Sequence, residues 1–141
     1  MGVDETRSMD GPAAVPPPPV RPVLIDPTQL ALQRAMQGAN LRQEALASNL
    51  ANANTPGYRR RDVEFHDALR GAMGTADPTS ALQSVGFSPQ TDATGPVRAD
   101  GNAVDVDAES AKMAANGLEY EQLASAARVR IDILKIAMGV G

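Results

Sequence analysis

Two stretches with heptad spacing of apolar and small residues, one near each end of the 141-residue chain, constrain its fold most strongly. Within residues 26–54 the spacing alternates between four and three positions and is interrupted once, by the polar Gln43. Within residues 105–138 the same alternation has no polar break. Such spacing is typical of long helices that pack along one another. It predicts a mostly α fold in which two long terminal helices form a coiled-coil-like hairpin and one domain.

We call the residues on these two heptad lines the N-terminal and C-terminal seams. Their main members are Leu32, Met36, Leu46 and Leu50 in the first helix, and Met113, Tyr120, Ile131 and Leu134 in the second. Asp26 is a suitable N-cap for the first helix, and Pro27 takes the first helical position, where no N–H is needed. Gln29 is placed to close a capping box. Asp105 or Asp107 is expected to cap the second helix.

Bulky apolar residues are too few for a thick independent core. Leu, Ile, Val and Phe account for 28 of 141 residues, about 20%, where chains begin to look disordered. The total apolar fraction reaches 43% largely through 24 alanines. The net charge of −4 argues against a nucleic-acid partner, and the absence of cysteine excludes a disulfide framework. We therefore expect the helices to be stabilised mainly by packing against each other or against neighbouring subunits.

The remaining chain divides into an N-terminal tail and a middle region. Residues 1–25 form a disordered-type, Pro-rich tail, because seven of the eleven prolines fall at positions 12–27. Residues 55–104 are rich in glycine and proline, which predicts an irregular loop region with minor β content. Within it, residues 62–69 suit either a strand or a short helix, and residues 85–87 give a brief strand signal.

The sequence offers little catalytic chemistry, and we predict no catalytic, cofactor or metal residues. His66 is the single histidine. With Asp62 four positions earlier it would supply two metal ligands on one helical face, but two such ligands rarely hold zinc, so a surface histidine is the preferred interpretation. The basic run 59–61 is suited to meeting an acidic neighbour, but a solvated turn is the preferred interpretation. No stretch is long and apolar enough for a membrane span, and no cleaved signal peptide is recognisable.

The most informative segment ends the first helix. Its candidate site residues are Asn49, Asn52, Asn54, Thr55, Pro56, Gly57 and Tyr58. Pro56 and Gly57 occupy the second and third positions of a predicted type II turn that places Tyr58 beside the helix. Asn52 and Asn54 tolerate left-handed backbone. Three asparagines exceed what a helix end needs, so we expect their amides to contact another backbone, with another subunit as one option.

The segment Ser48-Asn49-Leu50-Ala51-Asn52-Ala53-Asn54-Thr55-Pro56-Gly57-Tyr58 resembles the characteristic motif of the bacterial flagellar axial proteins, the rod and hook family. Residues 59–65 and 100–109, followed by Met113, Asn116 and Tyr120, resemble a proximal rod member of that family. The resemblance covers roughly residues 28–69 and 98–139. It implies a non-enzymatic subunit without cofactors.

The same resemblance implies where such a subunit works. It would be exported by the flagellar type III apparatus without signal cleavage and would polymerise helically in the periplasmic part of the basal body, transmitting motor torque. Its expected partners are other rod subunits, the inner-membrane ring and the export gate. Two other hypotheses remain open: a two-helix adaptor or secretion-linked protein that binds a partner without polymerising, and an enzyme or metal protein that uses His66.

Overall fold

The computed structural model describes residues 26–139, and the tail predicted for residues 1–25 lies outside them. The described part is predominantly helical, with four helices and one pair of very short strands. The elements in chain order are α1 (Pro27–Ala51), β1 (Arg61–Asp62), α2 (His66–Met73), α3 (Pro78–Ser84), β2 (Gln90–Thr91) and α4 (Val106–Ala137). Within residues 26–139 no helix has both the length and the apolar character needed to cross a bilayer.

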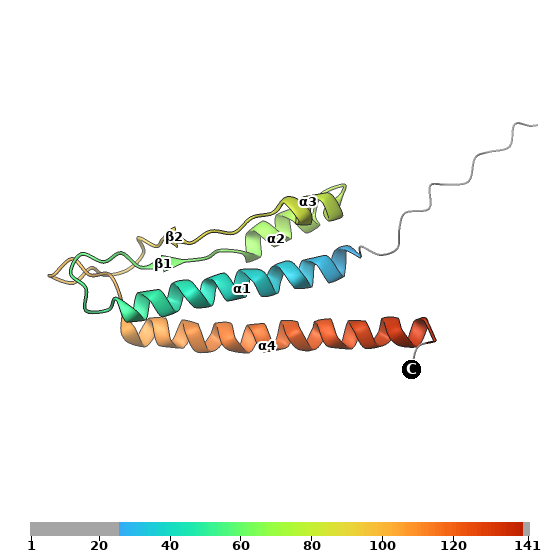
Figure 1. Ribbon diagram of the computed structural model, residues 1–141. Helices are drawn as coiled ribbons and strands as arrows, with labels where there is room; N and C mark the ends of the chain where they lie inside the picture. Colours follow the sequence, from blue (N-terminus) through green and yellow to red (C-terminus); the bar gives the residue numbers. More distant parts are fainter. Residues whose placement is uncertain (1–25, 140–141) are drawn as a thin grey trace, which may run out of the picture.

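The two long helices lie side by side and run in opposite directions (Figure 1). The Asp26 carboxylate caps α1 by accepting a hydrogen bond from the Thr28 N–H at 2.9 Å, with Pro27 at the first position. Asp105 caps α4 in the same way. The predicted capping box is wrong, because the buried Gln29 Oε1 has no hydrogen-bond partner. Strong N-caps thus fix where both long helices begin.

The C-terminal ends of both helices lie close to the predicted positions. α1 ends at Ala51 rather than at residue 54, and residues 52–57 form turns and a bend. α4 ends at Ala137, one residue before the predicted end. The last predicted residues of the first helix therefore belong to the connection that leaves it.

The middle region is more ordered than the sequence predicted, because it contains α2 and α3. α3 begins with Asp77, whose carboxylate accepts from the Ser80 N–H, and with Pro78 at the first helical position. The strand expected at residues 85–87 is wrong. Instead β1 pairs with β2 in an antiparallel register that places Arg61 opposite Thr91. Both strands are two residues long, so the β content is minor, as predicted.

The middle region packs along one side of α1 (Figure 1). It also contacts α4, since Asp62 forms an ion pair with Lys112 and His66 pairs with Glu119. α1 contacts both α4 and the middle region and is the central element. The buried cluster on this side comprises Ala35, Ala39, Ala45, Val63 and Phe65. Gly38 allows the closest approach, because a Cβ atom there would lie only 2.5 Å from Phe65 Cγ. α1 therefore has two buried faces, whereas the heptad spacing predicted one.

Candidate functional site

The predicted turn after α1 forms as expected from the sequence. Gly57 has a φ of +73°, and the Tyr58 N–H donates to the Thr55 carbonyl at 3.2 Å. Tyr58 lies beside α1, where its hydroxyl is 3.3 Å from Ser48 Oγ. Asn52 does not use left-handed backbone, since in residues 26–139 positive φ values occur only at glycines.

Asn49 is the central residue of this site and is completely buried. Its side-chain amide donates to the Arg61 carbonyl and to Glu109 Oε2, both at 2.7 Å. Its Oδ1 accepts from the Arg61 N–H at 2.9 Å and from the Tyr58 hydroxyl at 3.3 Å. One side chain thus joins α1 to β1 and to the first turn of α4. The predicted contact with another backbone is present, and it lies within the same chain rather than in another subunit.

The other two motif asparagines differ in their surroundings. Asn52 donates to the Ser48 carbonyl and accepts from the Thr55 hydroxyl, so both of its side-chain contacts are local. Asn54 is exposed, as is Pro56. Only Asn49 among the three asparagines therefore reaches a distant segment with its side chain.

Asn102 completes the site, although no pattern in the sequence singled this residue out. This fully buried side chain donates to the Asn52 carbonyl at 2.9 Å and to the Thr55 carbonyl at 2.7 Å. Nearby, the Gly57 N–H donates to the Asp100 carbonyl at 3.0 Å. The segment before α4 thereby holds the turn after α1. Asn102 could have been recognised only from its position in the segment 100–109, which carries the second part of the family resemblance.

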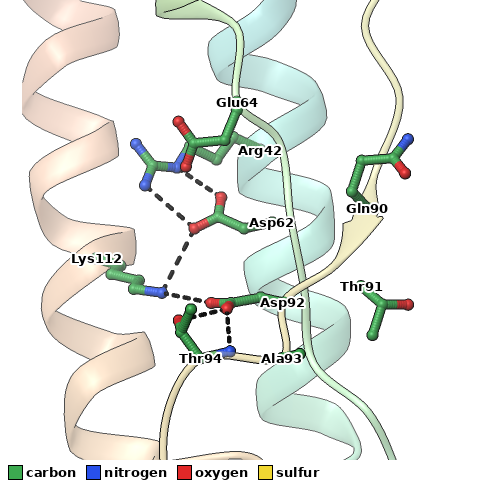
Figure 2. Close-up of a pocket in the computed structure, with 9 residues that line it drawn as sticks. All are labelled: Arg42, Asp62, Glu64, Gln90, Thr91, Asp92, Ala93, Thr94 and Lys112. Atoms are coloured by element: carbon green, nitrogen blue, oxygen red, sulfur yellow. Dashed lines mark hydrogen bonds and ion pairs between the residues drawn. The ribbon is translucent and has the colours of Figure 1, made fainter.

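A group of charged side chains, which we call the ionic cluster, connects the layers on one flank of the site. Figure 2 shows four of its members: Arg42, Asp62, Asp92 and Lys112. Asp62 accepts from Arg42 of α1 at 2.8 Å and lies 3.4 Å from Lys112 Nζ of α4. Asp92 lies 3.7 Å from the same ammonium and 3.0 Å from the Arg60 guanidinium. Arg60 is consequently buried, which corrects the interpretation of residues 59–61 as a wholly solvated turn.

Burial and hydrogen bonding shift the pKa of each aspartate in this ionic cluster in opposite directions. Burial disfavours the charged form of Asp62, but hydrogen bonds from Arg42 and the Val63 N–H outweigh it and lower the Asp62 pKa. For Asp92, hydrogen bonds from Thr94 likewise outweigh burial and lower its pKa. Both carboxylates are therefore anionic at neutral pH. They line an open cavity of about 490 Å³ and pair there with Arg42 and Lys112, which is the arrangement of a structural network.

The seam residues are covered to very different degrees. Leu46 is fully buried, whereas Ile131 and Leu134 keep 43% and 44% of their surface exposed. The remaining main seam residues are half-buried: Leu32, Met36, Leu50, Met113 and Tyr120. The ion pair between Arg130 and Asp26 places the start of α1 beside Arg130. The last two turns of α4 therefore extend beyond α1 and leave their seam residues uncovered.

The polar break at Gln43 has a partner on α4. Asn116, which is almost completely buried, donates to Gln43 Oε1 at 2.8 Å and to the Ala39 carbonyl at 2.9 Å. A buried polar contact between two packed helices fixes their alignment. The sequence predicted the break but not its partner.

The His66 and Asp62 side chains do not come together. Asp62 belongs to the ionic cluster, whereas His66 begins α2 and its Nε2 lies 2.6 Å from Glu119 Oε1 of α4. In the part of the chain that the structure describes, no three His, Cys, Asp or Glu residues are grouped to hold a metal ion. The arrangement around the motif is thus one of interlocked polar contacts between segments.

Comparisons with known proteins agree with this geometry. A family model described as flagella basal body rod protein matches residues 30–59, which span most of α1 and the turn. The flagellar basal body rod protein FlgB of Aeromonas hydrophila is 37% identical over 63% of this chain and 75% of its own length. FlgB of Escherichia coli is 34% identical over 73% of this chain and 88% of its own length. FlgB of Bacillus subtilis is 28% identical over 78% of this chain and 92% of its own length.

Proposed function

Because the chain belongs to the FlgB family of flagellar basal body rod proteins, we propose that α1 and α4 form a coiled-coil-like hairpin through which it polymerises helically into the proximal rod. The protein is a structural subunit of that rod and not an enzyme. The proposed assembly domain comprises residues 26–54 and 105–138, with residues 55–104 as a connecting region and 1–25 as a tail.

The observation that carries this proposal is the uncovered end of the C-terminal seam. Ile131, Leu134 and Met138 lie on the line of α4 that faces α1 further along the helix, yet all three are exposed. An apolar helix face that continues past its partner within the chain is suited to a helix of a neighbouring subunit. The junction of Asn49 and Asn102 supports the same function, since it holds the opposite end of the hairpin in one geometry.

The proposed setting follows from the family. The subunit would contact other rod subunits, the inner-membrane ring and the export gate in the periplasmic part of the basal body. It would reach that place through the flagellar type III apparatus without cleavage of a signal peptide. Assembled there, its axially packed helices would transmit motor torque.

The proposal is tested by placing a charge on the uncovered seam. In cells that lack the native gene, Leu134→Asp is expected to abolish rods and motility, because a carboxylate left unpaired in an apolar interface is strongly destabilising. Arg128→Asp changes more charge at an exposed position of the same helix and should leave rods in place. Circular dichroism of both purified variants checks that the isolated subunit folds equally well.

Two outcomes would contradict the proposal. If Leu134→Asp and Arg128→Asp both supported normal rods, the uncovered seam would not be an assembly surface. If isolated basal bodies lacked this chain while it still bound a flagellar partner, it would act as a non-polymerising adaptor.

A further inference from the structure

α4 carries a line of uncharged side chains on a side that α1 leaves uncovered. All of its members are exposed, and they follow one another in steps of three or four residues, the spacing of a helix face that packs along a partner. We call these residues the far stripe: Ala111, Ala115, Leu118, Gln122, Ser125, Val129, Ile133 and Ile136. Leu118 and Ile136 keep 62% and 76% of their surface exposed. A helix with apolar residues on two sides is suited to a place between two packing partners.

The two halves of the far stripe differ in side-chain size. The N-terminal half begins with two alanines, whereas the C-terminal half contains Val129 and Ile133. The C-terminal half also forms one wall of an open groove of about 620 Å³, and Thr28 and Leu32 of α1 form the other wall. Small residues let two helices approach closely, because the distance between helix axes depends on the side chains at the contact. The small-residue half of one α4 therefore suits the groove of another.

The charges of α4 are divided between the same two halves. Residues 105–121 carry five carboxylates and one lysine, whereas residues 122–138 carry two arginines, one lysine and one aspartate. Within residues 26–139, Glu121, Arg128 and Lys135 are exposed and take part in no ion pair. Two copies of α4 side by side in register would bring like charges together. Copies displaced along the helix axis bring the basic half of one beside the acidic half of the next, which favours that alignment.

We propose that the groove of one copy receives the N-terminal half of the far stripe of a second copy, whose α4 runs parallel and is displaced by two heptads. This rests on the proposed function, since subunits of a helical polymer meet head to tail through unlike surfaces. Two heptads correspond to about 21 Å along the helix. The displacement places Val129 beside Ala115 of the next copy and brings Lys135 level with Glu121 of that copy. The far stripe and the uncovered seam are then two separate contact surfaces of the subunit.

Disulfide trapping in assembled rods tests the proposal, since the native sequence has no cysteine. The test variant carries Ala115→Cys and Val129→Cys and is expressed in cells that lack the native gene. These two positions are about 21 Å apart along one helix, whereas a disulfide requires Cα atoms within about 7 Å. Every disulfide that forms therefore joins two copies. The matched control carries Ala115→Cys and Arg128→Cys, because position 128 is also exposed but lies about 100° around the helix from position 129.

Basal bodies isolated after mild oxidation are analysed on non-reducing gels. The test pair is expected to link copies into oligomers larger than dimers, with at least about tenfold more linked protein than the control pair, because only the test positions face each other. Linked dimers alone would overturn the proposal, since they would indicate an antiparallel pair that closes on itself. Equal linking of the two variants, or intact rods without any linking, would also overturn it.

A charge substitution separates this contact from the proposed function. Leu118→Asp is expected to abolish rods, because it places a carboxylate in the contact. It should leave the circular dichroism of the isolated subunit unchanged, because Leu118 is exposed there. Ser110→Asp, at an exposed position of α4 outside the far stripe, should leave rods in place. If Leu134→Asp abolished rods and Leu118→Asp did not, the proposed function would stand and the far-stripe contact would be wrong.

Discussion

The Asn49 amide donates to Glu109 Oε2 at 2.7 Å, and both side chains are completely buried between the end of α1 and the start of α4. The other carboxylate oxygen, Oε1, has no hydrogen-bond partner, although Lys112 Nζ lies 3.5 Å away. Asn49 is therefore a principal source of stabilisation for a carboxylate inside the protein. Because the same amide also binds the Arg61 backbone, its loss would loosen three segments at once.

Asn49→Ala is expected to lower the free energy of unfolding by about 3 kcal/mol, because it removes the hydrogen bond to a buried carboxylate and leaves two backbone groups without their partners. Urea unfolding of the purified subunit measures this loss. Asn54→Ala is the matched control, since Asn54 is an exposed asparagine of the same motif, and it should change stability by less than about 0.5 kcal/mol. Equal effects of the two variants would contradict the central role of Asn49.

Gly57→Ala is expected to destabilise the subunit by about 1 kcal/mol, because an alanine is strained at the positive φ of this turn. A Cβ atom at position 57 would meet no other atom within 4 Å, so the backbone alone causes the effect. Gly71→Ala is the matched control. A Cβ atom at position 71 would also meet no other atom within 4 Å, but Gly71 lies inside α2. There the substitution should stabilise the helix. Thermal unfolding that shifted both variants in the same direction would argue against the turn geometry.

The ionic cluster predicts how stability depends on pH. Folding lowers the pKa values of Asp62 and Asp92 below the ordinary aspartate value of 3.8. Their contribution is therefore fully present above that value and is lost as the pH falls through the lower folded-state values. Asp62→Asn should reduce stability at pH 7 and make the loss of stability below about pH 3.8 less steep. Asp67→Asn, at an exposed aspartate, should change the stability at pH 7 by less than about 0.5 kcal/mol.

The long helices were predictable because their signals are local. α1 is capped by Asp26 with Pro27 at its first position, and α4 is capped by Asp105, as predicted. The heptad spacing extends over many turns of both helices. α3 was missed, and a short helix near α2 was predicted only as one of two options for residues 62–69. Each of these helices has only seven or eight residues and too few apolar positions to show a helical period. The cap at Asp77 with Pro78 was the one local signal, and it resembles the cap of α1.

The site was predictable only in part, because its partners are far apart in the sequence. The motif indicated that Asn49 binds a backbone, but Arg61 is 12 and Glu109 is 60 positions away. Glu109 lies in the first turn of α4, where acidic residues are commonly solvated, yet it is fully buried. Charge runs and caps carry no information about such pairings, which depend on how α4 returns along α1.

The two ends of the seams should respond differently to the same loss of side-chain volume. Leu46 is fully buried, so Leu46→Ala is expected to remove about 2–5 kcal/mol of stability from the isolated subunit by leaving a cavity. Leu134 is 44% exposed beyond the end of α1, so Leu134→Ala should change that stability by less than about 0.5 kcal/mol. In cells the two variants should fail for different reasons. Leu134→Ala should give a stable subunit that assembles poorly, whereas Leu46→Ala should give less folded subunit. Urea unfolding of each purified variant, combined with counts of basal bodies per cell, distinguishes the two effects. Poor assembly of Leu134→Ala that was matched by an equal loss of its own stability would mean that this end of α4 is covered within the subunit.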